Sequence, residues 1–290
     1  MTPQDNVRHK DKWAYHPDMD PKTFIMEQHW EKYSDAEHAV WNALYERQMK
    51  ILPGRAVDEY LQYIEQIGFG SNGIPNFDAV SKKLMDTTGW RIVAVPGLIP
   101  GDIFFGHLAN RIFPVTYWIR KPEQMDYLPE PDLFHDLFGH VPMLMNPFIA
   151  DYIQTYGKGG LKAMQIPGGL IRITRLYWYS IEFGLMRTPK GMRIYGAGIM
   201  SSKEESIYAV ESPRPHRVKF DVKRMMQTDY RYFDLQETYF VIDSYDELIE
   251  ATNPDFTPYY NELYKKPIID PKELRPGDEV ITQGTVIKEK

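Results

Sequence analysis

Two histidines five residues apart are the first feature of this sequence that could bind a metal ion. His135 and His140 lie in the segment PEPDLFHDLFGHVP. The prolines at its start and Asp132 favour a helix that begins here, and Pro142 predicts that this helix ends around His140. On a regular α-helix, side chains five residues apart diverge by about 140°. We expect Gly139 to let the chain leave helical geometry, so that both imidazoles can converge on one point.

A third ligand is needed, because two such histidines alone are more simply explained as one near a helix end and one packed in the core. The candidate is Glu182, in the mostly apolar and aromatic run Leu170–Met186, which predicts a helix buried nearly all round. An unpaired carboxylate is costly to bury in such a setting. Its partner is therefore either an arginine, Arg172 or Arg175, or a divalent metal.

The chemistry of these ligands limits the choice of metal. The chain has no cysteine, so any metal must take nitrogen and oxygen ligands. Two histidines and one carboxylate form the facial triad of non-haem iron(II) oxygenases, which leaves positions open for oxygen and a co-substrate. The same set also serves hydrolytic zinc. The chain has no HExxH motif, and no glutamate stands next to His135 as a general base, so the residues favour iron but leave zinc open.

The elements that position these residues are mainly helical. Capping signals predict helices that begin at Ser34, Asp58, Asn76 and Ser244, and Gly89 predicts the end of the third. Short β-like segments lie between them: Arg91–Val95, Thr116–Arg120, Arg193–Tyr195 and Thr238–Ile242. The predicted fold class is mainly α with a few short β-strands. We expect residues 1–22 to be a flexible tail, residues 23–267 a single catalytic domain, and residues 268–290 a loose C-terminal tail.

Composition places the chain among ordinary globular proteins. Of its 290 residues, 43% are hydrophobic and 26% are charged, which is too apolar for a disordered protein. The net charge of −6 disfavours nucleic acid as a partner. No apolar stretch is long enough to cross a bilayer, and the N-terminus lacks the apolar core of a secretion signal. We expect a cytoplasmic protein without a membrane partner.

Three separated motifs of the chain resemble those of a known enzyme family. PEPDLFHDLFGHVP, RLYWYSIEFGL and IYGAGIMSS resemble the catalytic domain of the pterin-dependent aromatic amino acid hydroxylases, and the similarity runs from about Trp90 to Ser244. The chain looks most like the bacterial phenylalanine 4-hydroxylases of that family. The resemblance implies that His135, His140 and Glu182 are iron(II) ligands.

The resemblance also implies binding sites for the pterin and the amino acid. The pterin residues would be Gly97, Leu98, Phe104, Asp136 and Tyr177, with Phe104 stacked on the pterin ring. From the sequence alone, Phe104 would be a core residue and Asp136 a solvated helix charge. Arg120, otherwise an ordinary surface charge, would clamp the substrate carboxylate through two parallel hydrogen bonds. The other substrate-site residues by resemblance are Leu128, Pro129, Trp178, Phe183, Gly198 and Ser201.

Two of these positions carry alternatives or departures. Ser201 matches a hydroxyl that orients the first histidine, although Ser201 or Ser202 could equally cap the following helix. Leu128 stands where animal members usually have threonine. The glycines of Gly196-Ala-Gly198 do not match a nucleotide-binding loop, because the third glycine is missing.

The implied function is phenylalanine 4-monooxygenase, which converts L-phenylalanine to L-tyrosine with O2 and a tetrahydropterin at one iron(II). Trp178 favours phenylalanine over tryptophan, since tryptophan hydroxylases tend to carry a smaller ring at the matching position. Tryptophan 5-hydroxylase, a zinc hydrolase with the same triad, and a non-enzymatic binder are the alternatives. No match to the regulatory domain or the tetramerisation helix of animal members is found, so we expect a monomer.

Overall fold

The computed structural model describes residues 13–253 and 255–285. Contacts between residues divide this part of the chain into two compact units. We call Met1–Lys50 with Glu59–Leu161 unit 1, and Ile51–Asp58 with Lys162–Lys290 unit 2. None of the described helices is both long and apolar enough to cross a membrane.

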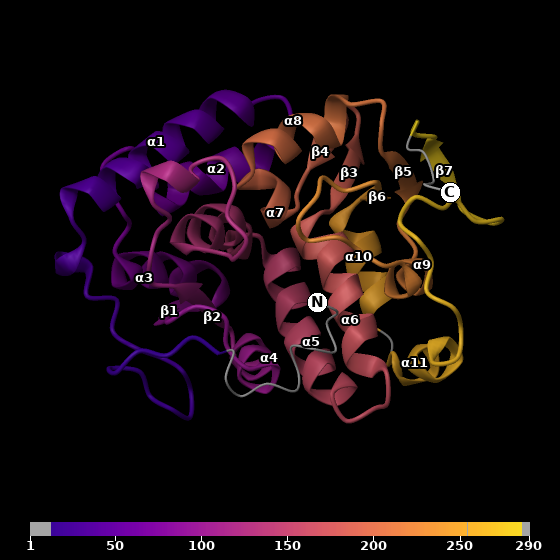
Figure 1. Ribbon diagram of the computed structural model, residues 1–290, viewed down its shortest axis with the longest axis horizontal. Helices are drawn as coiled ribbons and strands as arrows, with labels where there is room; N and C mark the ends of the chain where they lie inside the picture. Colours follow the sequence, from indigo (N-terminus) through magenta and orange to yellow (C-terminus); the bar gives the residue numbers. More distant parts are fainter. Residues whose placement is uncertain (1–12, 254, 286–290) are drawn as a thin grey trace. The chain divides into compact units, whose positions relative to one another are not determined.

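Unit 1 is a set of helices around a two-stranded parallel sheet. Strands β1 (Arg91–Val95) and β2 (Ile112–Thr116) pair in parallel, with α3 against β1 and α4 against β2 (Figure 1). The helices are α1 (Asp35–Ile51), α2 (Asp58–Ile67), α3 (Phe77–Thr88), α4 (Gly101–Ala109) and α5 (Pro147–Ala163). Short 3₁₀ turns cover Trp30–Lys32, Pro122–Gln124 and Val141–Met145, and a π-helical turn covers His135–His140.

Local capping explains why the predicted helices begin where they do. At α1 the backbone N–H of Ser34 donates to Glu37, and the N–H of Glu37 donates back to the Ser34 hydroxyl, which is a capping box. At α3, Asn76 accepts from Ala79. That helix ends at Gly89, whose φ of 72° suits glycine. These three predictions are confirmed.

Unit 2 is built on a five-stranded mixed sheet in the order β4-β3-β6-β5-β7 (Figure 1). The strands are β3 (Leu185–Thr188), β4 (Gly191–Ile194), β5 (His216–Lys219), β6 (Thr238–Ile242) and β7 (Val280–Thr282). Strand β6 is central and parallel to both neighbours, and all five of its residues are buried. The β-like segment predicted at Thr238–Ile242 is thus confirmed, and a strand covered on both faces is expected to be mostly apolar.

The helices of unit 2 are short, and α6 precedes the first strand of its sheet. They are α6 (Gly169–Tyr177), α7 (Ala197–Met200), α8 (Lys203–Glu211), α9 (Val222–Gln227), α10 (Tyr245–Thr252) and α11 (Thr257–Leu263). A π-helical turn, Trp178–Glu182, continues α6. Ser244 accepts from the N–H of Glu247 at the start of α10, as its capping box predicts.

Three element boundaries differ from the sequence predictions. The strand expected at Thr116–Arg120 lies at Ile112–Thr116, because pairing with β1 sets its register. Strand β4 ends at Ile194, not at Tyr195. The helix expected over Leu170–Met186 ends as an α-helix at Tyr177, and its last two residues belong to β3.

The predicted tails contain ordered contacts within the described residues. Ala14 donates its backbone N–H to Leu98, and β7 pairs antiparallel with β5. The hydroxyl of Thr238 donates to the carbonyl of Pro271. Residues 268–285 therefore differ from the expected loose tail, because sheet pairing and side-chain bonds fix them. Residues 1–12 of the predicted N-terminal tail and residues 286–290 of the C-terminal one lie outside the described residues.

Candidate metal centre and neighbouring sites

The two histidines of unit 1 lie at the two ends of one π-helical turn, His135–His140. A π-helix joins residues five apart, so residues five apart are stacked one turn above the other. The Nε2 atoms of His135 and His140 are 3.2 Å apart as a result. The expected role of Gly139 is wrong: this buried residue stays inside the helical turn, and the wide turn itself brings the imidazoles together.

Hydrogen bonds and ring contacts fix the start and the middle of this wide turn. Its first residue, His135, donates its N–H to Asp132 at 3.0 Å. Inside the turn, the hydroxyl of Tyr60 donates to the carbonyl of Phe138, and Phe138 stacks on Phe134 with 4.8 Å between ring centroids. A π-turn is rare within a helix, and the non-local bond from Tyr60 helps to select it here.

Arg120 is buried in unit 1 and paired with Asp132. Its Nε and Nη2 donate to the two carboxylate oxygens at 2.9 and 2.8 Å, and its backbone N–H donates to the same group. Asp132 is fully buried. Arg120 is thus not the ordinary surface charge that the sequence alone suggests. Two of its five N–H donors are used on Asp132 and a third approaches the Met125 carbonyl at 3.5 Å, which leaves donors for a ligand.

Asp136 is also buried, which rules out a solvated helix charge. One carboxylate oxygen accepts from the N–H of Thr116 at 2.7 Å. Burial raises the pKa of this carboxyl to about 7, and the hydrogen bond from Thr116 opposes the rise only in part.

The loop predicted to bind the pterin lies between β1 and α4. Gly97 adopts a φ of +148°, and a Cβ there would meet the Ala14 side chain at 3.0 Å. Leu98 is exposed, and Trp118 donates its indole N–H to Pro96. Phe104 packs against a small cluster of Val93, Val95 and Ile99. Phe104 is therefore partly a core residue, as the sequence alone suggests.

The remaining predicted substrate residues of unit 1 lie in a connection without regular structure. Leu128 is half-buried and Pro129 is exposed, in the segment before the π-helical turn.

In unit 2, Glu182 ends the second π-helical turn, whose last bond runs from the N–H of Phe183 to the carbonyl of Trp178. The arginines that could have neutralised Glu182 bond elsewhere. Arg175 pairs with Asp229 at 2.9 Å, and Arg172 donates to the carbonyls of Met226 and Leu263. The explanation of Glu182 by an arginine partner is therefore wrong.

The glycines of the IYGAGIMSS motif allow close approach of backbone to the π-helical turn. A Cβ at Gly196 would lie 2.4 Å from the Glu182 carbonyl oxygen, and one at Gly198 would lie 3.1 Å from Glu182 Oε2 and 3.0 Å from Phe183. Their φ values need no left-handed geometry, so space is the reason for glycine here.

The two serines that follow these glycines have separate roles. Ser202 is the cap of α8, and its hydroxyl accepts from Glu205. The Ser201 hydroxyl donates to the carbonyl of Ala197.

Aromatic residues of unit 2 make contacts that could not be predicted from the sequence. Trp178 stacks on Tyr230 with 4.2 Å between centroids, contacts Phe183 at 4.6 Å, and donates its indole N–H to Gln236 at 2.8 Å. Tyr177, predicted near the pterin, is half-buried at the end of α6. Tyr230 and Gln236 lie outside every recognised motif, and neither periodicity nor capping marks them.

The donor set fits a divalent metal ion. His135, His140 and Glu182 each offer one ligand atom, and these three atoms lie within 4.8 Å of one another. Two imidazole nitrogens and one carboxylate, with no thiolate, suit iron(II) or zinc and leave positions for further ligands.

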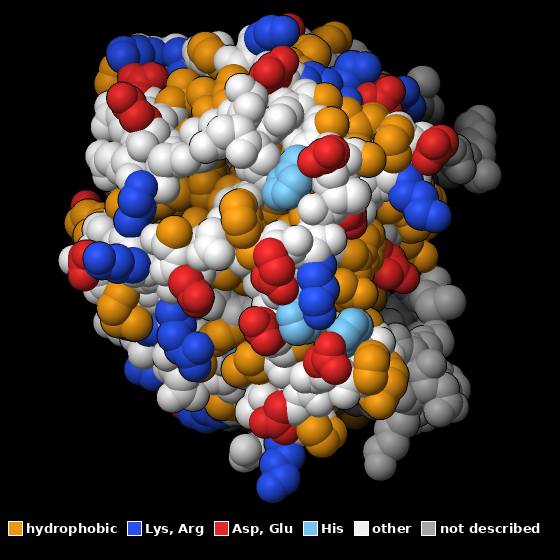
Figure 2. Space-filling model, turned by 90° about the vertical axis from the view of Figure 1, so that its left-hand side faces the viewer, with side chains coloured by type: hydrophobic (Ala, Val, Ile, Leu, Met, Phe, Trp, Pro, Cys, Tyr) orange, Lys and Arg blue, Asp and Glu red, His pale blue; other side chains and the backbone are white. Residues whose placement is uncertain are grey.

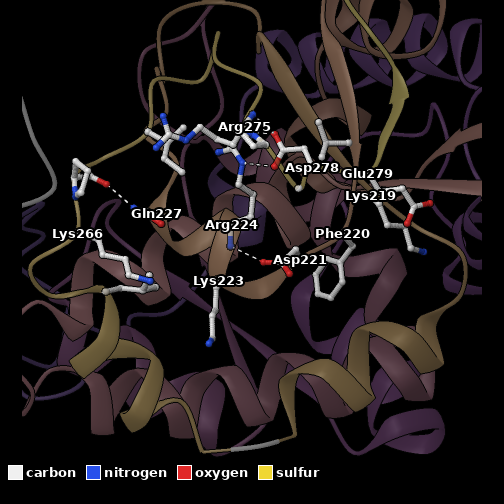
Figure 3. Close-up of a pocket in the computed structure, with 16 residues that line it drawn as sticks. Lys219, Phe220, Asp221, Lys223, Arg224, Gln227, Lys266, Arg275, Asp278 and Glu279 are labelled. Carbon is white, nitrogen blue, oxygen red and sulfur yellow. Dashed lines mark hydrogen bonds and ion pairs between the residues drawn. The ribbon is translucent and has the colours of Figure 1, made fainter.

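Unit 2 also has a cavity with many charged residues in its lining. A cavity of about 610 Å³ is lined by Arg224 and Asp278, which pair at 2.9 Å, and by several lysines (Figure 3). Those lysines also have carboxylate partners, and none of the predicted site residues lines this cavity. On the face drawn in Figure 2, acidic and basic side chains are interspersed, in agreement with the small net negative charge.

Comparisons with known proteins agree with these features. Residues 28–268 match the sequence profile of the family described as "Biopterin-dependent aromatic amino acid hydroxylase". The chain is 55% identical to the phenylalanine-4-hydroxylase of Ralstonia nicotianae over 90% of this chain and 83% of that protein.

Two crystal structures of Chromobacterium violaceum phenylalanine hydroxylase are also similar. One has iron and phenylalanine bound (TM-score 0.87, 52% identity, 91% of this chain and 96% of the other). The other has iron(III) and oxidised 7,8-dihydrobiopterin bound (TM-score 0.88, 53% identity, 91% and 94%). The predicted fold class, a mainly helical catalytic domain of this type, is confirmed, and the chain belongs to the biopterin-dependent aromatic amino acid hydroxylases.

Proposed function

We propose that this chain is a phenylalanine 4-monooxygenase, which converts L-phenylalanine to L-tyrosine with O2 and a tetrahydropterin at one iron(II). The observation that carries the proposal is the donor set of two histidines and one glutamate in two π-helical turns. Similarity over nine-tenths of the chain to a phenylalanine-4-hydroxylase supports the choice of reaction.

The metal would be held by His135, His140 and Glu182. When bound, iron(II) together with a tetrahydropterin supplies the oxygen activation that no amino acid side chain can perform. The protein's part is to fix the ligands. The Asp132 carboxylate fixes the N-terminal end of the first π-helical turn, and Gly198 leaves room for the Glu182 carboxylate.

The pterin would be held in unit 1 by the loop at Gly97 and Leu98, by the ring of Phe104 and by the buried carboxyl of Asp136. Tyr177 of unit 2 completes the set taken from the family resemblance. A flat ring suits an aromatic neighbour, and its polar edge suits backbone N–H and carbonyl groups.

The amino acid substrate would be oriented by Arg120. Asp132 holds the guanidinium by one edge, so its remaining donors are fixed in direction before the substrate arrives. Such pre-orientation favours binding of a carboxylate. The ring of the substrate would contact Trp178, Phe183, Leu128, Pro129 and Gly198. Ser201 would orient His135.

Tryptophan 5-hydroxylase is the second candidate within the same chemistry. The observation that bears on it is the bulk of Trp178, which also fills space against Tyr230 and Phe183. Parallel assays with iron(II), a tetrahydropterin and O2 should give tyrosine from phenylalanine faster than 5-hydroxytryptophan from tryptophan. The opposite order of rates would overturn the substrate assignment.

A zinc hydrolase with the same three ligands makes a different prediction. Its activity would persist without oxygen, whereas the proposed enzyme should be inactive under strict anaerobiosis. Zinc should restore no activity to the metal-free proposed enzyme.

We also propose that the protein is a cytoplasmic monomer. Light scattering of the purified protein should give a mass near 34.0 kDa. A mass twice that value would contradict the monomer.

A further inference from the structure

Gln236 is a buried amide whose hydrogen-bonding groups are directed at the segment before β6 and at Trp178. Its Nε2 donates to the carbonyls of Arg231 and Asp234 at 2.9 and 3.1 Å. Its Oε1 accepts from the indole N–H of Trp178 at 2.8 Å. These three partners fix which end of the amide is oxygen, because an indole can only donate and a carbonyl can only accept.

The backbone of Gln236 is anchored as firmly as its side chain. Its N–H donates to the carboxylate of Glu205 in α8 at 3.0 Å, and the same carboxylate accepts from the hydroxyl of Tyr239. Gln236 and Glu205 are both buried. The acceptor that faces Trp178 is therefore held from two directions.

The side chain of Trp178 has little rotational freedom once its indole N–H donates to Gln236. One contact, with Tyr230, is nearly parallel at 17° between the ring planes, and the contact with Phe183 is tilted by 32°. Stacking alone does not distinguish ring positions related by a half-turn about the Cβ–Cγ bond, whereas a hydrogen bond at the indole nitrogen does.

Tyr230 lies on the same segment as Gln236. The start of this segment is fixed by the ion pair of Arg175 with Asp229 and by the hydroxyl of Tyr179, which donates to the carbonyl of Asp229.

We propose that Gln236 is a positioning residue that selects the side-chain rotamer of Trp178 and thereby sets the preference of the site for the phenylalanine ring. This inference rests on the proposed function, in which Trp178 contacts the substrate ring. Gln236 would not touch the substrate. It acts by preventing the indole from turning into, or away from, the space that the ring occupies.

The first test replaces the acceptor with a side chain of similar length. Gln236→Met removes the bond to Trp178 together with the two bonds to the segment before β6. Loss of the bond to Trp178 should raise the KM for phenylalanine about five-fold, with a much smaller change in kcat. The ratio of phenylalanine to tryptophan turnover should fall. Gln227→Met is the matched control, because Gln227 donates one hydrogen bond to Pro267 on the exposed side of the same unit. It should leave all three quantities unchanged.

A double-mutant cycle separates positioning of Trp178 from damage to the segment. Trp178→Phe removes the indole N–H, so adding Gln236→Met to it should change KM little further. If Gln236→Met acts equally in both backgrounds, the residue only supports the segment and the proposal is overturned.

The second readout does not depend on turnover. The chain has six tryptophans, so a ¹H–¹⁵N spectrum of the purified protein shows at most six indole N–H signals. The signal missing from Trp178→Phe belongs to Trp178, and Gln236→Met should shift it towards the position of an indole without an acceptor. An unmoved signal would overturn the proposal. If the unsubstituted protein made no tyrosine, the proposed function would fail, while this spectrum would still decide the orientation of Trp178.

Discussion

The buried pair of Arg120 with Asp132 gives the most quantitative prediction about stability. Four hydrogen bonds converge on the Asp132 carboxylate: from Nε, Nη2 and the backbone N–H of Arg120, and from the backbone N–H of His135. Asp132→Asn removes the charge and replaces one acceptor oxygen with an NH2 group that faces donors. Arg120 is then left charged and 8% exposed. Breaking a buried ion pair in this way costs about 3–5 kcal/mol.

The two single substitutions should differ in a definite order. Asp132→Asn should lower the free energy of unfolding by about 5 kcal/mol, because it leaves an unpaired cation and disturbs both backbone bonds. Arg120→Met should lower the free energy of unfolding by about 3 kcal/mol, because the carboxylate keeps its two backbone donors. The double variant should be more stable than the sum of the single effects predicts, by about 2 kcal/mol, because neither buried charge is then left without its partner.

The assay is urea unfolding of the three variants and the unsubstituted protein under one set of conditions. Arg187→Met is the matched control: Arg187 makes the same two-bond contact with Asp243, at 2.8 and 2.9 Å, but both side chains are exposed. It should cost less than about 1 kcal/mol. If Arg120→Met cost no more than this control, or if the double variant were additive, the reasoning from burial would be refuted.

Three further predictions concern the metal ligands and one buried carboxyl. Glu182→Gln should weaken iron(II) binding in equilibrium titrations by at least about 100-fold, since even outer partners of a ligand are worth 10- to 100-fold; unchanged affinity would exclude Glu182 as a ligand. Gly198→Ala should weaken iron(II) binding about ten-fold, because its Cβ would crowd Glu182 Oε2, whereas Gly106→Ala, where a Cβ meets nothing within 4 Å, should not. Burial raises the pKa of Glu205 from 4.5 to about 7, so its stabilising effect is complete below about pH 4.5 and is lost as the pH rises through about 7. Between about pH 5 and 8 the unsubstituted protein should therefore lose about 3 kcal/mol of unfolding free energy relative to Glu205→Gln, and parallel pH profiles of the two proteins would contradict this.

Some elements could be predicted from sequence because their causes are local. The capping boxes at Ser34 and Ser244, and the cap at Asn76 with Gly89, involve residues that lie within a few positions of the helix ends. The apolar run of β6 is likewise visible in a short window. The strand expected at Thr116–Arg120 was displaced, because its register depends on β1, about twenty residues away.

In the candidate site, too, only the features that depend on local sequence could be predicted. The three ligand types could be identified from sequence, but the device that joins His135 to His140 could not, because a π-turn is selected by contacts such as that of Tyr60 with Phe138. The partner of Arg120 and the acceptor for Trp178 were missed for the same reason. Each belongs to a pair that the folded chain brings together and that no periodic pattern marks.

The central claim, that oxygen from O2 is inserted into an amino acid ring at an iron site, is tested most directly by isotope labelling. The iron(II)-loaded protein is supplied with phenylalanine, a tetrahydropterin and ¹⁸O2, and the tyrosine formed is analysed by mass spectrometry. We predict tyrosine with one ¹⁸O atom, no label when ¹⁸O is supplied only as water, and no tyrosine from the Glu182→Gln variant. Tyrosine labelled from water, or formed equally well without iron, would contradict the account.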